Sequence, residues 1–594
     1  MPIPRKGSKK SPLLQKLSGP SATRYGALPS IPLPGDNELQ RSFNTDVAHV
    51  LKTSDLYRRA TVPMIPFEGA LREMDPANFV SWSQNYFVCH KRRTDKDGNP
   101  LTTLRDMTES TARLCLKSTE VISVTPMIHR VYPSPVPIIT TQGALILCTP
   151  GYDPSTGTYV FEGNITPQPP DPARPIITGP VASDSYFDDS LTLAEAFWYL
   201  YDLHAAFPFN DWTEEIIPAD GDPLQAWHPD GTPRTYRLSR SLSVQIGAML
   251  ALFAANCVPK EASKMGFIDN ANSQRSGKTL LVKIATAPVY GAFKAQSWRE
   301  DEESMVKILD AEILAASPYI CFDNVRGLMQ STKLEALFTS PMWTGRILGK
   351  SEMFTAENNL TVFITGNNVN AGTDIMHRCL LIDLFVEEAD IQSRQKPAKI
   401  INDVWLARSE NRRAILSALW SIVRHWDHAG RPLADVQKTR LGFEEWGQII
   451  GGMVEHSMFG DMLERITLEN AGDSEAENVL TLVKLLYERT ISKLTPAHDF
   501  TYQELVHTCW DHGLFPWNLH GREDSRALRP DQPAVITLNL ESKCQSRMGL
   551  LFARHAPGKG ALHVFRDATT GNMVRLRFSH KGSGRHKRFF ITPI

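Results

Sequence analysis

Eight consecutive residues near the middle of the chain have the types and order that bind a triphosphate. A phosphate-binding loop needs backbone N–H groups turned toward an anion, a lysine that reaches the outer phosphates and a hydroxyl for magnesium, all at the amino end of a helix. The run GFI before the loop predicts a strand, and KTLLVKIATA after it predicts a helix that stops at Pro288. The loop is Asn272, Ser273, Gln274, Arg275, Ser276, Gly277, Lys278 and Thr279.

The first position of this loop departs from the usual pattern, which begins with glycine. Asn272 stands there, whereas Gly277, Lys278 and Thr279 keep the second half of the pattern. Asparagine is among the few residues with a side chain that adopt a positive φ at modest cost. The loop is therefore predicted to bind ATP with Mg²⁺, although a lone motif of this kind also occurs as a chance polar turn.

Three more polar residues lie at the ends of predicted strands. Asp323 ends the run YICF and would hold the magnesium of a bound triphosphate. Asn367 ends the run LTVFITGN and would hold the attacking water, and Arg378 precedes LLIDLF, from where an arginine reaches a neighbouring subunit's nucleotide. Each residue alone is weak evidence, because Asp and Asn are common in loops. Their order and even spacing favour a single ATP site.

The length and composition are those of an ordinary globular protein with several domains. A chain of 594 residues is too long for one core and predicts roughly three or four domains. Its 42% hydrophobic residues, 22% charged residues and net charge of -1 indicate no particular partner. No apolar run reaches the roughly eighteen residues of a membrane span, so we expect a cytoplasmic protein. The eight cysteines are scattered singly, which predicts neither disulfides nor a zinc site.

Changes in composition along the chain predict five segments with an α/β fold class. Residues 1–45 are predicted to be a basic disordered tail, and residues 46–175 a mixed accessory domain of short strands and turns. Residues 190–390 combine helical periods with four short apolar runs, as expected for a parallel sheet with helices. Residues 391–475 are predicted to be mostly helical, and residues 476–594 return to short strands and turns.

With these motifs, the chain resembles the superfamily 3 type of AAA+ helicase found in replication proteins of phages, plasmids and mobile elements, often described as primase-helicases. The resemblance lies between residues 130 and 594, in the phrases TPGYDPSTG, RSGKTLL, FDNVRG, FTSPMWTGRILGKSE, TGNN and FEEWGQIIGGM. It implies a P-loop AAA+ core, a winged-helix-like C-terminal domain, and a homo-hexameric ring that hydrolyses ATP between subunits. Such a ring moves along single-stranded or forked DNA.

Carried over by position, the resemblance implies a role for each motif residue. Lys278 and Thr279 would bind the phosphates and magnesium, and Asp323 would hold magnesium. Asn367 would be the polar sensor, and Arg378 would be the arginine finger.

A second departure from the family pattern lies beside the magnesium ligand. Asn324 follows Asp323 directly, where many AAA+ ATPases have a glutamate that polarises water. An amide cannot accept a proton as a carboxylate does. Either another acid serves, with Glu302 or Glu303 the nearest candidates, or hydrolysis is slow. The alternative for these two acids is favourable charge at a helix amino end.

Two basic regions are candidates for contact with DNA. The segment Arg346–Glu352 lies where such helicases have a pore hairpin, with Gly349 in its turn and Lys350 at the DNA phosphates; the alternative is an exposed loop lysine. The stretch RLRFSHKGSGRHKRFF suits a β-wing on the DNA backbone, or else a solvated basic strand pair. The candidates there are Arg575, Arg577, Lys581, Arg585, Lys587 and Arg588.

Together these features predict an ATP-dependent DNA helicase or translocase that serves replication of a phage or mobile element. One alternative is a primase-helicase whose N-terminal part makes primers. A primase needs clustered carboxylates for two metals, and the pairs Asp188–Asp189 and Asp220–Asp222 are predicted to be loop acids. Another alternative is an ATP-binding scaffold on DNA that barely hydrolyses, which Asn324 favours.

Overall fold

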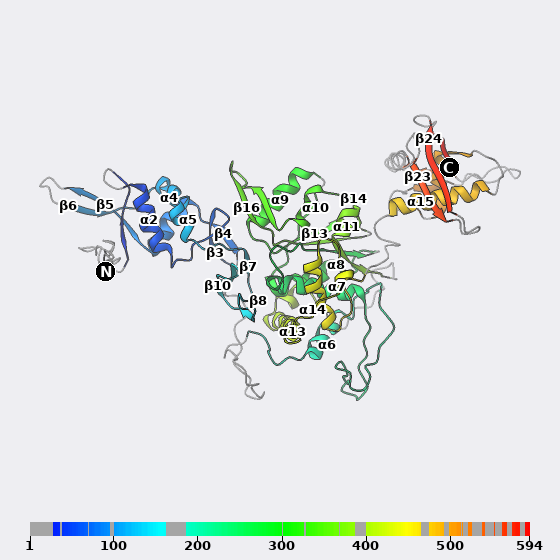
Figure 1. Cartoon of the computed structure of the whole chain (residues 1–594), viewed down its shortest axis with the longest axis horizontal. Helices are drawn as coiled ribbons and strands as arrows, with labels where there is room; N and C mark the ends of the chain where they lie inside the picture. The colour runs from blue at the N-terminus through cyan, green and yellow to red at the C-terminus, as the bar shows by residue number, and fades with distance from the viewer. Residues whose placement is uncertain are drawn as a thin grey trace, which may run out of the picture. The chain divides into compact units, whose positions relative to one another are not determined.

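The computed structural model contains two compact units, residues Met1–Arg465 and Ile466–Ile594 (Figure 1). Among the described residues, no helix is both long and apolar enough to cross a membrane. The structure describes residues 28–35, 39–68, 70–94, 100–161, 186–271, 273–299, 301–325, 328–367, 369–386, 400–464, 474–491, 498–512, 514, 521–524, 537–540, 552, 561–566, 573–581 and 588–593.

The first unit begins with a small mixed domain. Its elements include β1 (Ser30–Pro32), α2 (Gln40–Leu51), β2 (Tyr57–Arg59), β3 (Val62–Phe67), β4 (Ala70–Glu73), α3 (Pro76–Trp82), β5 (Val88–Thr94), β6 (Pro100–Leu104), α4 (Glu109–Leu116) and α5 (Thr119–Val124). Helix α2 buries Phe43, Val47 and Leu51, which recur at the helical spacing of four residues. The prediction of a disordered tail over residues 1–45 is wrong for the described residues from 28 on. There β1 pairs in parallel with β5, and α2 begins at Gln40. Residues 1–27 lie outside the described residues.

The prediction of short strands and turns for residues 46–175 is wrong at α3, α4 and α5, whose amino ends are capped by Asp75, Thr108 and Ser118. Five short strands follow these helices, as the alternating apolar sequence predicts: β7 (Arg130–Tyr132), β8 (Val136–Ile139), β9 (Leu145–Cys148), β10 (Gly151–Asp153) and β11 (Thr158–Val160). The phrase TPGYDPSTG contains β10 and the turn that connects β10 to β11. The Asp153 carboxylate accepts hydrogen bonds from Ser155 Oγ at 2.7 Å and from the backbone N–H of Thr156 at 2.9 Å. Gly157 has a φ of 66°, and a Cβ there would lie 2.3 Å from the His129 ring. The turn therefore packs closely on the strand that carries Arg130.

A parallel sheet is the centre of the first unit. Its strands are β12 (Gly266–Ala271), β13 (Tyr319–Val325), β17 (Thr361–Asn367) and β19 (Cys379–Leu384), in the order β13-β17-β12-β19. All three pairings are parallel, so the four carboxyl ends lie at one edge of the sheet. The four apolar runs of the sequence are these four strands, and their buried residues include Phe267 and Phe363, whose rings stack at 5.3 Å. The prediction of a parallel α/β layer is confirmed.

Helices cover the sheet and pack on one another (Figure 1). They include α6 (Leu193–His204), α7 (Arg240–Phe253), α8 (Lys278–Tyr290), α9 (Glu302–Leu314), α10 (Thr332–Thr339), α11 (Thr373–His377), α12 (Asp403–Ala407), α13 (Ser409–His428) and α14 (Glu444–His456). Helices α6 and α7 form where the apolar period is helical, and Thr192 and Ser239 cap their amino ends. The predicted end of α8 at Pro288 is wrong. The helix continues to Tyr290 and ends at Gly291, which has a φ of 80°, because a proline in the last turn removes little helical hydrogen bonding.

The second unit contains an antiparallel sheet with two helices. Its described elements are α15 (Ser474–Ile491), β20 (His498–Thr501), α16 (Tyr502–Asp511), β21 (Gly521–Asp524), β22 (Thr537–Leu540), β23 (Ala561–Arg566), β24 (Met573–Lys581) and β25 (Arg588–Pro593). The sheet order is β20-β25-β24-β23. Leu482 and Leu486 of α15, Leu505 of α16, and Phe578 and Phe589 of the sheet share one apolar core.

The described residues between 28 and 161 form the part that we call the N-terminal domain. It binds the base of a two-stranded hairpin, β15 (Met342–Arg346) and β16 (Met353–Glu357). Arg59 is 1% exposed, and its guanidinium donates to Glu357 O at 2.7 Å and to Ile313 O at 2.9 Å. The Glu357 carboxylate lies 3.0 Å from Arg130 Nη2 and 3.1 Å from His129 Nδ1. We call these the base contacts. Burial opposes ionisation of Glu357, but the hydrogen bond from His129 and the charge of Arg130 outweigh it and lower its pKa from 4.5 to about 2.

The base contacts predict the effect of Glu357→Gln. This change leaves the buried Arg130 without its anion, so the free energy of unfolding of the first unit should fall by roughly 3 kcal/mol at neutral pH. Because the folded pKa lies below the ordinary value, the carboxylate stabilises the wild type above about pH 4.5 and progressively less as the pH falls toward 2.

Urea unfolding at several pH values measures this difference, which should be largest at neutral pH and shrink in acid. Glu68→Gln is the control, because Glu68 forms an exposed ion pair with Arg72 and should matter little. Equal stability of Glu357→Gln and the wild type at neutral pH would contradict the assignment.

Candidate nucleotide site

The predicted phosphate loop lies between the carboxyl end of β12 and the amino end of α8. Ala271 ends the strand, and the helix begins at Lys278 after Gly277, whose φ is 103°. A Cβ at Gly277 would lie 2.9 Å from the Phe207 ring, so glycine is needed both for its backbone angle and for the close approach. Asn272 lies outside the described residues. The free N–H groups at the start of α8 make this edge of the sheet attractive to an anion.

Lys278 is held within the loop by three acceptors. Its Nζ donates to Asn367 Oδ1 at 2.6 Å, to Ser273 O at 3.1 Å and to Ser276 Oγ at 3.2 Å. Burial lowers the pKa of Lys278, and the nearby carboxylates of Asp269 and Asp323 oppose that shift. Two residues that the sequence singled out, Lys278 and Asn367, are therefore in contact.

Thr279 and Asp323 also meet, as two predicted magnesium ligands must. Thr279 Oγ1 donates to Asp323 Oδ1 at 2.9 Å. The same oxygen accepts a second hydrogen bond from Thr365 Oγ1 at 2.6 Å, and Thr365 Oγ1 in turn accepts from the backbone N–H of Asn324 at 3.0 Å. Mg²⁺ prefers oxygen ligands and is usually held by one or two carboxylates together with substrate phosphates and water. One carboxylate and one hydroxyl beside a phosphate loop fit that requirement, and no group of three or more metal-binding side chains exists elsewhere in the described part of the chain.

Two residues of this cluster were missed from the sequence. Thr365, 1% exposed on β17, fixes the Asp323 carboxylate, and Asp269 on β12 pairs in register with Thr365. Asp269 is also 1% exposed, and neither of its carboxylate oxygens has a hydrogen-bond partner among the residues that the structure describes. Burial raises its pKa well above the usual value; the charge of Lys278 opposes this rise, and that of Asp323 adds to it. The sequence did contain a signal for this residue, because Asp269 is an acid inside the largely apolar run GFIDNA.

The two acids proposed in place of a glutamate at position 324 make other contacts. Glu303 is 82% exposed and forms an ion pair of 2.8 Å with Lys307. Glu302 Oε1 accepts from the backbone N–H of Thr332 at 2.8 Å. Both lie in the first turn of α9, where a carboxylate is favoured by the helix dipole. No contact recorded among the described residues joins either acid to the phosphate loop.

Arg378 lies at the opposite end of the sheet from the loop. Its backbone carbonyl accepts from Gly266 N at 2.9 Å, so it stands at the amino ends of β12 and β19. Its Nη1 lies 3.5 Å from Thr339 Oγ1. At about 3.3 Å per residue, the length of β12 separates Arg378 from the loop of its own chain by roughly 17 Å.

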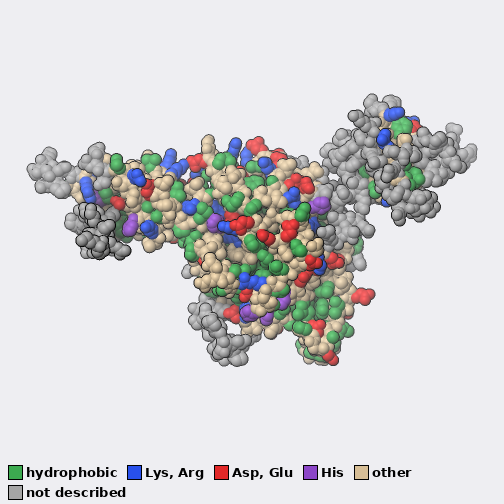
Figure 2. Space-filling model, in the orientation of Figure 1, with side chains coloured by type: hydrophobic (Ala, Val, Ile, Leu, Met, Phe, Trp, Pro, Cys, Tyr) green, Lys and Arg blue, Asp and Glu red, His purple; other side chains and the backbone are tan. Residues whose placement is uncertain are grey.

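The predicted DNA-binding residues occupy two separate regions. Lys350 lies at the tip of the β15–β16 hairpin, where Gly349 has a φ of 76° and forms the turn as predicted, and its Nζ forms an ion pair with Glu73. In the second unit, Arg577 and Lys581 are exposed on β24, and Arg588 on β25 lies 3.4 Å from Asp499. The side chain of Arg575 is not described, and Arg585 and Lys587 lie outside the described residues. Figure 2 shows basic and acidic side chains interspersed on the described surface of the first unit.

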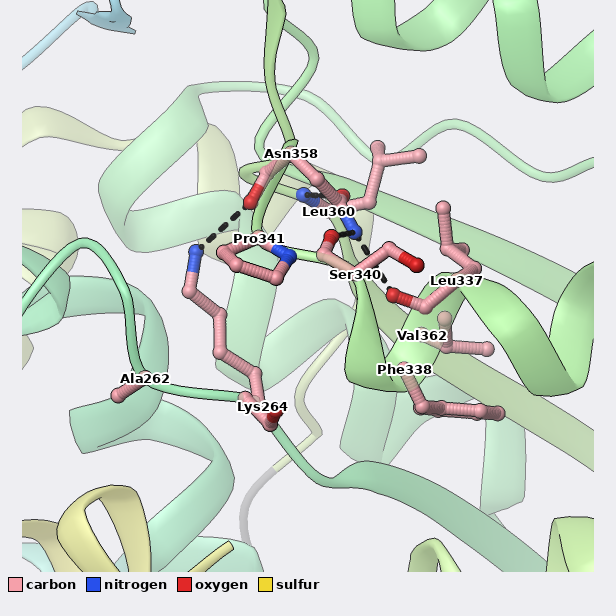
Figure 3. A pocket seen from close by; sticks show the side chains of 10 residues that line it. Ala262, Lys264, Leu337, Phe338, Ser340, Pro341, Asn358, Leu360 and Val362 are labelled. Carbon is pink, nitrogen blue, oxygen red and sulfur yellow. Dashed lines mark hydrogen bonds between the residues drawn. The ribbon is translucent and has the colours of Figure 1, made fainter. Parts of the chain in front are cut away.

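The strands of the site are joined again at their amino ends. Lys264, two residues before β12, donates to Asn358 O at 3.2 Å, and Asn358 leads from the hairpin to β17 (Figure 3). Asn358 Nδ2 donates to Leu337 O at 2.8 Å and to Ser340 O at 3.0 Å. Burial lowers the pKa of Lys264 to about 7; the charges of Arg130 and Arg59 add to this, and Glu357 opposes it. The base of the hairpin is thus connected to β12, which leads into the phosphate loop, and to β17, which ends at Asn367.

Comparison with known proteins yields likenesses of structure alone. No family model and no curated protein matches the sequence. The JCV helicase, solved with a bound thiazolopyridine-phenoxyphenyl acetamide, matches 38% of this chain and 67% of its own, with 12% identity and a TM-score of 0.20. The C-terminal region of NrS-1, in an apo form, matches 79% of this chain and 100% of its own, with 9% identity and a TM-score of 0.24. Because both TM-scores lie below 0.5, the assignment of the site rests on the contacts described above.

The contact between Thr279 and Asp323 predicts a magnesium-dependent effect of Asp323→Asn. Losing one charged ligand should weaken ATP binding in magnesium by roughly tenfold or more, as removal of a charged partner usually does. In EDTA the variant and the wild type should bind ATP equally, because the phosphates then contact only the loop. Isothermal titration calorimetry with a non-hydrolysed ATP analogue measures both. Equal affinity in magnesium would remove Asp323 from the metal site.

Proposed function

We propose that this chain is an ATP-hydrolysing motor that moves along DNA, with ATP and Mg²⁺ bound at the loop of residues 272–279. The observation that carries the proposal is the pair of contacts Lys278–Asn367 and Thr279–Asp323. These residues come from three segments, and they converge at the carboxyl ends of adjacent parallel strands. In open α/β sheets, ligands bind in the crevice at that edge.

The chemistry follows from what each side chain can donate or accept. Phosphoryl transfer passes through a loose transition state, so catalysis consists mainly of positioning and charge stabilisation. Lys278, which now donates to Asn367, would turn to the outer phosphates, and the Asn367 amide would then be free to orient the attacking water. Thr279 and Asp323 would hold magnesium, which neutralises charge on the phosphates when bound.

The resemblance to ring helicases is supported by the position of Arg378. It lies roughly 17 Å from the loop of its own chain, as judged from the length of β12. An arginine at that end of the sheet contributes to hydrolysis only if a neighbouring subunit brings its nucleotide there. We therefore propose a homo-oligomeric ring, a hexamer by the resemblance, in which Arg378 completes the site of the next subunit.

Contact with DNA is proposed for two basic groups. Lys350 at the hairpin tip would contact the backbone of a strand inside the ring, and the exposed Arg577, Lys581 and Arg588 belong to a C-terminal domain that we propose to be winged-helix-like. Lys and Arg neutralise phosphates without reading sequence, so binding should weaken steeply with salt. By the resemblance, the motor would serve replication of a phage or mobile element.

One alternative function is favoured by a specific residue. Asn324 has an amide where a proton-accepting carboxylate is usual. In the described part of the chain, no contact joins Glu302 or Glu303 to the loop. An ATP-binding scaffold that assembles on DNA and hydrolyses slowly is therefore the second candidate. The primase alternative has less support, because Asp189 accepts from Trp420 Nε1 at 2.7 Å and Asp222 from the N–H of Leu224 at 2.8 Å, as structural acids do.

Mixing two inactive variants tests the motor and the ring together. Lys278→Ala should abolish ATP binding, whereas Arg378→Ala should bind ATP and fail to hydrolyse it. In an equal mixture of the two, an intact loop meets an intact arginine at about a quarter of head-to-tail interfaces, so ATPase activity should return in part. The measurement is phosphate release with and without single-stranded DNA.

Each outcome of that measurement separates the candidates. Wild-type turnover no higher than that of Lys278→Ala, with DNA present, would establish the scaffold instead of the motor. Loss of ATP binding in Arg378→Ala, or no recovery in the mixture, would refute the action of Arg378 on a neighbouring subunit.

A further inference from the structure

The N-terminal domain also contacts the β15–β16 hairpin at its tip, far from the buried base contacts. Lys350 Nζ forms an ion pair with Glu73, the last residue of β4, and Glu352 forms an ion pair with Lys117, which follows α4. We call these two pairs the tip contacts. Each side supplies one acid and one base, so the two surfaces are complementary in charge. The hydrogen bond and charge of Lys117 lower the pKa of Glu352.

The two sets of contacts differ greatly in burial. At the base, Arg59, Arg130 and Glu357 are each less than a tenth exposed. At the tip, the side chains of Lys350 and Glu73 are 43% and 38% exposed, and those of Lys117 and Glu352 are 60% and 46% exposed. Exposed ion pairs are weak and are screened by salt, whereas removing one partner of a buried pair is costly. The hairpin can therefore leave the N-terminal domain at its tip while it remains bound at its base.

We propose that the tip contacts restrain the hairpin in the DNA-free protein, and that a DNA phosphate competes with the Glu73 carboxylate for Lys350. This inference rests on the proposed function, because it requires DNA at the hairpin. A carboxylate and a phosphate oxygen offer an ammonium group the same kind of charge-assisted hydrogen bond. Space around Gly349, where a Cβ would meet nothing within 4 Å, leaves the turn room to move.

Release of the tip has a direct connection to the nucleotide site. Strand β16 ends at Glu357, and three residues connect it to β17, which begins at Thr361 and ends at Asn367. Arg130 Nε donates to Asn359 Oδ1 at 3.0 Å in this connection, and Lys264 contacts Asn358 from the start of β12. A shift of the hairpin would thus act on the two strands that carry Asn367 and the phosphate loop. Breaking the tip contacts should raise ATPase activity without DNA toward the DNA-stimulated level.

The test compares Glu73→Gln with a matched control, Glu68→Gln. Both changes remove one negative charge from the β3–β4 region, but Glu68 pairs with Arg72 and not with the hairpin. Fluorescence anisotropy of a labelled oligo(dT) measures DNA affinity at several salt concentrations. Glu73→Gln should bind up to about fivefold more tightly at low salt, as an exposed ion pair allows, and the advantage should vanish at high salt. Glu68→Gln should bind like the wild type.

Two further variants test whether the effect passes through Lys350. Lys350→Gln should weaken DNA binding, and adding Glu73→Gln to it should restore nothing, because the competition has lost its cation. If Glu73→Gln raises DNA affinity equally with and without Lys350, or if Glu68→Gln raises it as much, the effect is one of general charge and the proposal is overturned. Unchanged affinity of Glu73→Gln would overturn it as well.

A carbodiimide cross-link tests the contact itself. The reagent converts the Glu73 carboxyl group into an O-acylisourea. The neutral amine of Lys350 attacks the acyl carbon, the substituted urea leaves, and an amide bond joins the two residues. Mass spectrometry should find this linked peptide in the DNA-free protein, and oligo(dT) added beforehand should suppress it. A linked peptide that is formed equally with bound DNA would refute the competition. If no variant binds oligo(dT) at all, the DNA motor itself fails, whereas DNA binding that ignores Glu73 refutes only the restraint.

Discussion

The hydrogen bond between Lys278 Nζ and Asn367 Oδ1, at 2.6 Å, is the contact on which the rest of the site depends. A half-buried ammonium group needs an acceptor for each of its three protons, and Ser273, Ser276 and Asn367 provide them. Asn367 is within reach because β12 and β17 are parallel neighbours whose register sets Ala271 beside it. One residue more or less in either strand would move the amide away from the lysine.

The strands below this contact are apolar in their first residues and carry polar side chains near their carboxyl ends. Asp323 receives two hydroxyl hydrogen bonds, whereas the fully buried Asp269 receives none from the described part of the chain, and burial raises the pKa of Asp269. A buried acid without a donor is expensive as an anion, so burial favours the neutral form of Asp269. The apolar part of the sheet, around Phe267 and Phe363, keeps these groups in register.

At the amino ends of the same strands, the N-terminal domain packs against the base of the β15–β16 hairpin. Arg59 and Arg130 bind the hairpin base at Glu357, and Lys264 joins the beginnings of β12 and β17 through Asn358. The hairpin is therefore bound firmly where it is buried and weakly where Lys350 meets solvent. This difference follows from the dielectric surroundings of otherwise similar ion pairs.

Local sequence was enough to locate the four buried strands, helices α6 and α7, the turn at Gly349 and the residues that meet at the loop, because periodicity and backbone preference act over a few residues. It did not identify Thr365 or Asp269, since their importance arises only when β12, β13 and β17 lie side by side. The end of α8, the early start of the N-terminal domain and the pairing of Glu73 with Lys350 likewise depended on tertiary structure. Contacts between distant segments are set by packing and strand register, and no short stretch of sequence contains that information.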